Sequence, residues 1–74
     1  METTVARYYF HLRDGEKAYD DFTGADLLDD TSAAAFAQVI AGEISGDSQY
    51  DAFYVDARDE NDKQIAKVFL VPHH

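Results

Sequence analysis

The sequence lacks the features that usually stabilise a very small protein. Its 74 residues contain no cysteine, which excludes disulfides and thiolate metal sites. It has no tryptophan and a single proline, Pro72. Basic side chains are scarce, because 6 Lys and Arg stand against 15 Asp and Glu, for a net charge of −9. This charge repels nucleic-acid phosphates and anionic membranes, so we expect neither as a partner and expect basic proteins or cations instead.

Long apolar runs are absent as well. No stretch approaches the ~20 apolar residues of a membrane-spanning helix, and residues 1–6 have neither the basic start nor the apolar run of a signal peptide. The lack of cysteine permits a reducing compartment, so we expect a cytoplasmic protein of bacterial type. We expect one small domain over residues 1–74, with residues 1–4 and 72–74 flexible.

The chain does contain enough apolar material to fold. Hydrophobic residues make up 46% of it and aromatic residues 14%, which argues against global disorder. A chain of this length buries only about 60% of the surface that its unfolded form exposes, so its stability margin is small. Small domains without disulfides or metals often gain stability by oligomerisation. We therefore expect a homo-oligomer, most simply a dimer.

Residues 5–13 alternate in character with a period of two, which predicts a half-buried strand. Asp14-Gly15 then predicts a tight turn, and a weaker strand follows at about 17–20. Asp21-Phe22-Thr23-Gly24 is a second turn signal, after which Leu27 or Leu28 is expected to return to the core. In the first strand, one face is predicted to carry Tyr8, Phe10 and Leu12, and the other Arg7, Tyr9, His11 and Arg13.

A helix is predicted over about residues 31–45. Asp30 or Thr31 can cap its start, since a short side-chain oxygen can accept an unpaired backbone N–H. Gly46 stands where a left-handed C-terminal cap is expected. One apolar stripe with helical spacing is expected to face the sheet: Ala33, Phe36, Ala37, Ile40, Ala41 and Ile44.

Two more strands are predicted after the linker 46–49. Residues 53–58 and 65–71 alternate, and the charged segment 59–63 separates them as a hairpin loop. Pro72 ends the last strand because it cannot donate to a ladder. The predicted class is α+β, with the order β-β-α-β-β and one helix packed on one face of an antiparallel sheet.

The two sheet faces can be told apart. Lys67 should remain in water, so Ala66, Val68 and Leu70 are expected to face the helix together with Tyr8. The opposite face, called here the far face, is charged but is also expected to hold a cluster of five apolar residues, which is unusual for a solvated face. These are Tyr9, Tyr54, Ile65, Phe69 and Val71.

The segment Arg7-Tyr8-Tyr9-Phe10-His11-Leu12-Arg13-Asp14-Gly15 resembles the opening of a family of small, uncharacterised proteobacterial proteins of rhizobial type. The Asp21–Gly24 turn, the entry Leu28-Asp29-Asp30 and the Ala-rich helix are similar to that family too. The chain differs at Asn61-Asp62, where a Gly is common, and in its helix, which has no Arg and a single Glu, Glu43, in place of the usual pattern of Arg and Glu. The family has no known function, so the resemblance implies a fold and no activity.

Candidate chemistry is sparse. His11 is the only internal histidine, and Asp56 is expected to oppose it across the sheet. Three arginines, Arg7, Arg13 and Arg58, could contact a carboxylate or phosphate beside it. The alternative, which we favour, is that His11 lies on the strand without a role and that Arg–Asp56 pairs merely solvate the sheet. No metal-ligand set, phosphate loop or nucleophile motif occurs, so we expect no enzyme, cofactor or metal.

The back of the helix is the second unusual surface. Ala35, Gln38, Gly42 and Ser45 are small and uncharged, and small residues allow a second helix to approach closely. We therefore expect a self-associating interaction module that uses the far face (Tyr9, His11, Tyr54, Ile65, Phe69 and Val71) or the helix back. Two other functions stay open: an acidic inhibitor or nucleic-acid mimic that binds a basic groove on a partner, and a small-anion sensor using Arg7, His11 and Arg13.

Overall fold

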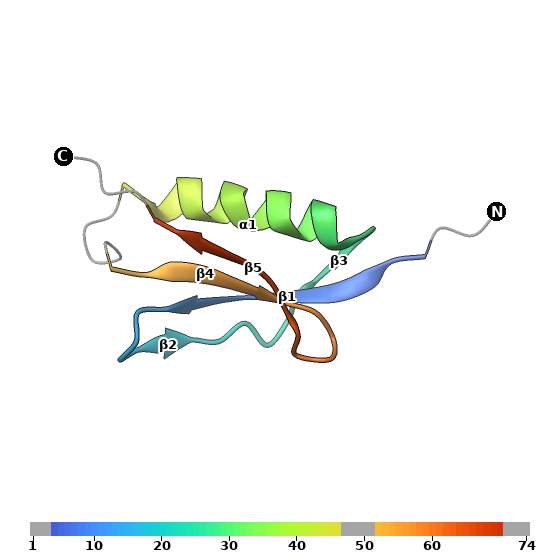
Figure 1. Ribbon diagram of the computed structural model, residues 1–74, viewed down its shortest axis with the longest axis horizontal. Coiled ribbons are helices and arrows are strands. Elements are labelled where there is room, and N and C mark those ends of the chain that lie inside the picture. Colours follow the sequence, from blue (N-terminus) through green and yellow to red (C-terminus); the bar gives the residue numbers. More distant parts are fainter. Residues whose placement is uncertain (1–3, 47–51, 71–74) are drawn as a thin grey trace.

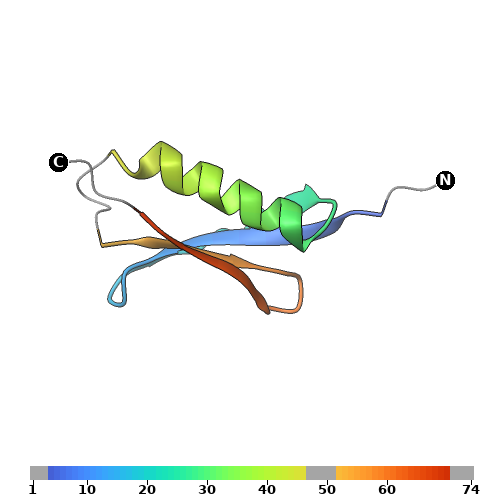
Figure 2. The ribbon, with the colours of Figure 1, turned by 45° about the horizontal axis from the view of Figure 1, so that its top comes forward.

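One helix lies across one face of an antiparallel sheet, as Figures 1 and 2 show. The computed structural model describes residues 4–46 and 52–70. The predicted α+β class is confirmed, with strands before and after the helix and one strand more than predicted. The elements are β1 (Ala6–Arg13), β2 (Ala18–Tyr19), β3 (Ala25–Leu27), α1 (Asp30–Ile44), β4 (Tyr54–Arg58) and β5 (Gln64–Phe69).

Some predictions lie outside the described residues. These are the flexible ends apart from Thr4, most of the linker, Val71 and the stop at Pro72.

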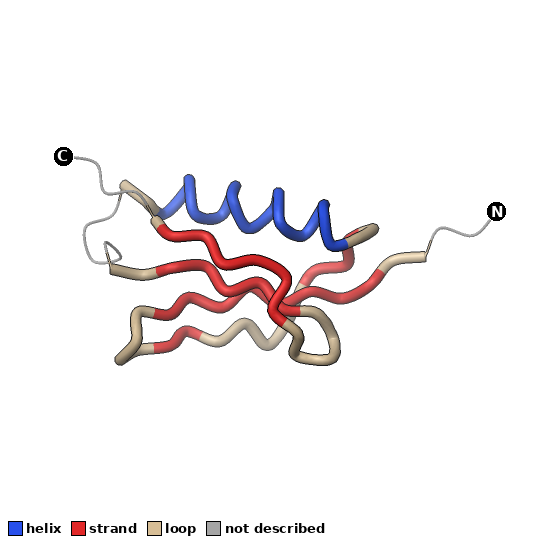
Figure 3. The backbone as a smooth tube through the Cα atoms, in the orientation of Figure 1, coloured by secondary structure: helices blue, strands red, loops and turns tan. Residues whose placement is uncertain are grey.

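The strands are ordered β2-β1-β4-β5, and β3 also pairs with β1. β2 pairs with the end of β1 and β3 with its start, so together they follow β1 as one interrupted edge strand. β5 forms the opposite edge, and within residues 4–46 and 52–70 no strand pairs with its outer side. The tube in Figure 3 shows α1 beside β5, away from β2.

β3 is the strand that the sequence pattern did not predict. It has only three residues and a single large apolar side chain, Leu27, so no alternation can be detected. Leu27 is half-buried and is therefore the residue that returns toward the core, whereas Leu28 is 61% exposed.

Asp21 interrupts the β2–β3 edge. One oxygen of its carboxylate, Oδ1, accepts the backbone N–H groups of Thr23 and Gly24, each at 3.0 Å. The other, Oδ2, accepts the N–H of Phe10 on β1 at 3.2 Å. The side chain therefore replaces a backbone carbonyl and ties the turn to the neighbouring strand. Burial alone would raise the pKa of Asp21, but these N–H groups outweigh it and hold the pKa below its usual value.

The caps of α1 differ from the prediction. Asp29, in an extended conformation at φ −162°, is the N-cap, and its Oδ1 accepts the N–H of Ser32 at 2.8 Å. Asp30 and Thr31 already lie in the helix, so capping by either was wrong. At the other end Ser45 keeps a helical φ of −66°, and its N–H donates to Ala41 O. Gly46 has no positive φ, so the predicted left-handed cap was also wrong.

The core lies between α1 and the middle of the sheet. Ala33, Ala37 and Ala41 are buried one turn apart, and Val55 and Ala57 of β4 are buried opposite them. The predicted register of β1 is confirmed, because Tyr8 is buried on this side and donates its hydroxyl hydrogen to Asp30 Oδ1 at 2.8 Å. That bond and the burial raise the pKa of Tyr8 to about 12. Phe10 meets Phe36 edge to face at 5.0 Å.

We predict that Gly24→Ala destabilises the fold more than Gly15→Ala does. Both glycines have positive φ, +75° and +96°, which costs an L-residue about 1 to 2 kcal/mol. Only at Gly24 would the new Cβ also collide, at 2.9 Å from Tyr8 O. The clash should cost about 1 to 3 kcal/mol more. Urea denaturation of both variants measures the difference, and equal losses would contradict the close approach.

Candidate functional site

A buried carboxylate organises the centre of the far face. The side chain of Asp56, in the middle of β4, is only 1% exposed. Its Oδ2 accepts Nε–H of Arg58 at 2.8 Å and of Arg13 at 3.0 Å, and its Oδ1 accepts the amide of Gln64 at 2.9 Å. Burial opposes the charge, but the hydrogen bonds from Arg58 and Gln64 and the two guanidinium charges hold the pKa of Asp56 below its usual value.

His11 lies opposite Asp56 in the β1–β4 register, as predicted. Its Nδ1 accepts the backbone N–H of Asp21 at 3.0 Å and lies 3.6 Å from Asp20 Oδ1. The ring stacks against Tyr9 with centroids 6.5 Å apart. The Nδ1 lone pair therefore holds the β2–β3 edge in place, and a general base would need that lone pair free.

The three arginines predicted to contact an anion each already bind a carboxylate. Arg7 forms a two-pronged pair with Asp26, with Nε 2.9 Å from Oδ1 and Nη2 3.3 Å from Oδ2. Arg13 and Arg58 share Asp56. An incoming phosphate or carboxylate would have to displace one of these groups. The structure also separates Arg7 from the other two, because it pairs with β3 rather than β4.

The five predicted apolar residues of the far face do not form one patch. Tyr54 and Phe69 are cross-strand neighbours with ring centroids 5.5 Å apart, and Lys67 Nζ lies 4.5 Å from the Tyr54 centroid. Tyr9 pairs with Arg58 at the other end of β4, beyond the Asp56 group. Ile65 lies at an irregularity between β4 and β5 and lines a hollow with helix residues Asp30, Thr31 and Ala34. Val71 is not among the described residues.

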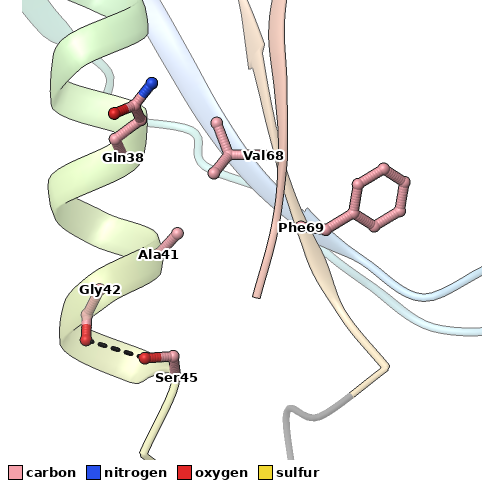
Figure 4. Close-up of a pocket in the computed structure, with 6 residues that line it drawn as sticks. All are labelled: Gln38, Ala41, Gly42, Ser45, Val68 and Phe69. Atoms are coloured by element: carbon pink, nitrogen blue, oxygen red, sulfur yellow. Dashed lines mark hydrogen bonds between the residues drawn. The ribbon is translucent and has the colours of Figure 1, made fainter. Parts of the chain in front are cut away.

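A second hollow, of about 260 Å³, lies where the last turns of α1 meet β5. In Figure 4, Val68 points toward α1 and Phe69 points away from it. The Ser45 hydroxyl donates to Gly42 O at 3.1 Å, so this polar group is satisfied within the helix. The predicted helix back is not one surface: Gln38, Gly42 and the buried Ser45 line this hollow beside β5, whereas Ala35 is exposed elsewhere on the helix. The lining residues are Gln38, Ala41, Gly42, Ser45, Val68 and Phe69.

Several large apolar side chains are exposed outside the surfaces predicted from the sequence. Phe22, in the Asp21 turn, is 89% exposed, and Val39 on α1 is 54% exposed. Phe69 is 63% exposed, as expected for the far face. The turn-forming residues around Phe22 were the feature of the sequence that could have predicted its exposure, because a large side chain in a tight turn has little to pack against.

Neither a metal-ligand cluster nor a membrane-spanning helix occurs in the described part of the chain. Within residues 4–46 and 52–70, no three His, Asp or Glu side chains converge as metal ligands. Over the same residues, no helix has both the length and the apolar character needed to cross a bilayer.

A comparison with models of known protein families identifies the family of this chain. Residues 7–71 match the model of a family described as Domain of unknown function (DUF6894). The chain belongs to this family. The DUF6894 match begins at Arg7, the first residue of the segment that resembled an uncharacterised family. Comparisons with curated proteins and with solved structures gave no match.

The β4–β5 loop contains a left-handed residue. Asp62 has a φ of 64°, a conformation that glycine adopts freely and that Asp tolerates better than most residues. Its carbonyl accepts Nη1–H of Arg58 at 2.9 Å, which connects the loop to the Asp56 group.

We predict that Asp56→Asn destabilises this DUF6894 domain by about 2 to 3 kcal/mol at neutral pH, because charge-assisted hydrogen bonds are lost while the arginines stay partly in water. The folded pKa of Asp56 is depressed, so its contribution is complete above the usual Asp pKa of about 3.9 and disappears as the pH falls through the folded value. The stability difference between wild type and variant should therefore shrink in acid.

Chemical denaturation at neutral and at strongly acidic pH measures this difference. Asp26→Asn is the matched control, since the Arg7–Asp26 pair is about half exposed. It should cost less than about 1 kcal/mol. If both variants lost the same stability at both pH values, the buried Asp56 group would not contribute as described.

Proposed function

We propose that this chain is a small acidic protein-interaction domain that associates with a second copy of itself. The observation that carries the proposal is the hollow of about 260 Å³ between α1 and β5. Uncharged helix residues line one side, and the other side is a strand edge without a partner among the described residues. Exposed apolar surface of this kind is typical of protein contact sites.

The composition of the core supports self-association. The helix contributes three alanines to the fully buried layer, and an alanine buries far less apolar area than a leucine would. A chain of 74 residues with so thin a core gains from burying further surface against a partner.

In this proposal the domain works in the bacterial cytoplasm, which a chain without cysteine permits, and it has no catalytic role. The hydrogen bond from the Asp21 N–H to His11 Nδ1 supports the absence of a catalytic role, because it uses the lone pair that a general base would need. The net charge of −9 argues against a nucleic-acid partner.

The positions of the acids favour self-association over an acidic mimic. Asp14, Asp21, Asp29 and Asp59 accept backbone N–H groups of their own turns or caps. Others pair with arginine, as Asp26 and Asp56 do. Much of the negative charge is thus used inside the fold rather than arranged for a basic groove.

We predict that sedimentation velocity detects a dimer at tens of micromolar protein, and that the dissociation constant falls several-fold as salt is raised. Each copy carries a charge of −9, so salt screens the repulsion between two copies. Binding of an acidic mimic to a basic partner would show the opposite salt dependence.

A species that stays monomeric at hundreds of micromolar protein, in both low and high salt, would end the proposal. Measurements at several pH values above 5 serve as a control, because the pKa values of Asp14, Asp21, Asp29 and Asp56 are held below the usual Asp value of about 3.9.

A further inference from the structure

On the outer side of β5, some backbone groups have no partner within residues 4–46 and 52–70, and the bond that ends the β4–β5 ladder identifies them. Leu70 N–H donates to Phe53 O at 3.3 Å, so these two residues form a hydrogen-bonded pair. Because bonded and non-bonded pairs alternate along an antiparallel ladder, Val68 also directs its N–H and C=O toward β4. Lys67 and Phe69 therefore direct theirs outward, to the free edge.

We propose that two copies join through β5, antiparallel and edge to edge, with the twofold axis at Val68. The inference rests on the proposed self-association and deepens it by naming the surface and the register. Lys67 of one copy then pairs with Phe69 of the other, and Phe69 with Lys67. The outward groups of these residues supply about four backbone hydrogen bonds, and the sheet continues through both copies.

Charge and side-chain chemistry favour this register over one with the axis at Lys67. An axis at Lys67 would place two ammonium groups directly opposite each other, which is unfavourable. With the axis at Val68, each Lys67 instead opposes an aromatic ring, and Lys67 Nζ already lies 5.2 Å from the Phe69 centroid within one copy. β5 contains no acidic residue, so two chains of charge −9 meet there with the least repulsion.

The position of α1 fits the same arrangement. The helix packs mainly on β4 and β5 and runs alongside β5 in Figure 1. A helix above the midline between β4 and β5 is half a strand spacing from β5, and the proposed axis is half a spacing beyond β5 on its outer side. The helix is therefore one strand spacing, about 4.8 Å, from the axis. The two helices would then be about 10 Å apart, the separation of directly packed helices.

The helix residues that face across this gap include Gln38 and Gly42, which line the hollow. Outside the backbone of its own helix turn and the two adjoining residues, no described atom lies within 4 Å of where a Cβ at Gly42 would be, so the flank is open for a neighbour. The side chain of Val68 lies on the helix side of β5, as Figure 4 shows, so Val68 of the second copy would enter the hollow. The free edge and the hollow thus point to one occupant, a second copy of this chain.

Single cysteines test the register on a background without native cysteine. Val68→Cys, Lys67→Cys and Ala66→Cys are oxidised at a protein concentration where the wild type is dimeric. In the proposed register the two copies of residue 68 form a non-bonded pair with Cα atoms about 4.5 Å apart, within disulfide range. Only Val68→Cys should give a covalent dimer in high yield. Preferential crosslinking at 66 or 67 would overturn the register.

Gly42→Arg and Val39→Arg test the surface itself. Both introduce the same charged residue on the same helix, and arginine is a better helix former than either residue it replaces. Val39 is exposed but lines neither hollow of α1. Gly42→Arg should raise the dissociation constant at least tenfold, whereas Val39→Arg and the small Gly42→Ala should leave it unchanged. Circular dichroism confirms that each variant is folded.

The two proposals fail in different ways. A monomeric wild type would remove both the proposed function and this pairing. A dimer that persists in Gly42→Arg, with no crosslink at 68, would leave self-association standing and place the interface elsewhere. If Gly42→Arg failed to fold, the cysteine series would still decide.

Discussion

The close approach of α1 to the sheet, made possible by alanine at three successive turns, determines where the helix lies and which edge of the sheet stays open. Ala33, Ala37 and Ala41 have no side chain beyond Cβ, so the helix settles directly on the small and branched residues of β4. This contact centres α1 over β4 and β5, while Phe36 reaches sideways to Phe10 on β1. The helix therefore leaves the outer side of β5 accessible, with a hollow beside it. A leucine in this stripe would lift the helix and separate it from Val55.

Aspartate takes over much of the role that glycine, proline and disulfides have in other small domains. Asp14, Asp21, Asp29 and Asp59 each accept a backbone N–H that a turn or helix start leaves unpaired. Asp56 holds two arginines on the far face. Many of the acidic side chains therefore stabilise the fold itself, in addition to giving the surface its negative charge. Such a fold should depend on its carboxylates being ionised, since a protonated carboxyl is a poorer acceptor for an N–H.

Sequence patterns were sufficient where a physical period repeats often enough to be detected. The alternation of β1 predicted that Tyr8 and Phe10 face the helix, and helical spacing predicted α1 to within a residue at each end. The patterns were insufficient where a single local contact determines the structure. Asp29, Asp30 and Thr31 are all good caps, and only the backbone angle at Asp29 selects among them. Nothing in the segment 57–65 marks the irregularity that separates Ile65 from Phe69.

The two edges of the sheet differ in a way that would limit how copies assemble in the proposed dimer. The β2–β3 edge is broken at Asp21. The carboxylate of Asp21 already accepts the N–H groups of Phe10 and Gly24, so these groups cannot bond to a further strand. Asp20 and Asp26 add negatively charged side chains at this edge. Edge strands are commonly protected in this manner. At β5 the lysine gives no such protection, because Lys67 Nζ lies over the rings of Tyr54 and Phe69 instead of projecting past the edge. With β5 as the edge that no described strand covers, the proposed assembly would close at two copies, since a twofold contact uses the β5 edge of both copies and leaves none for a third.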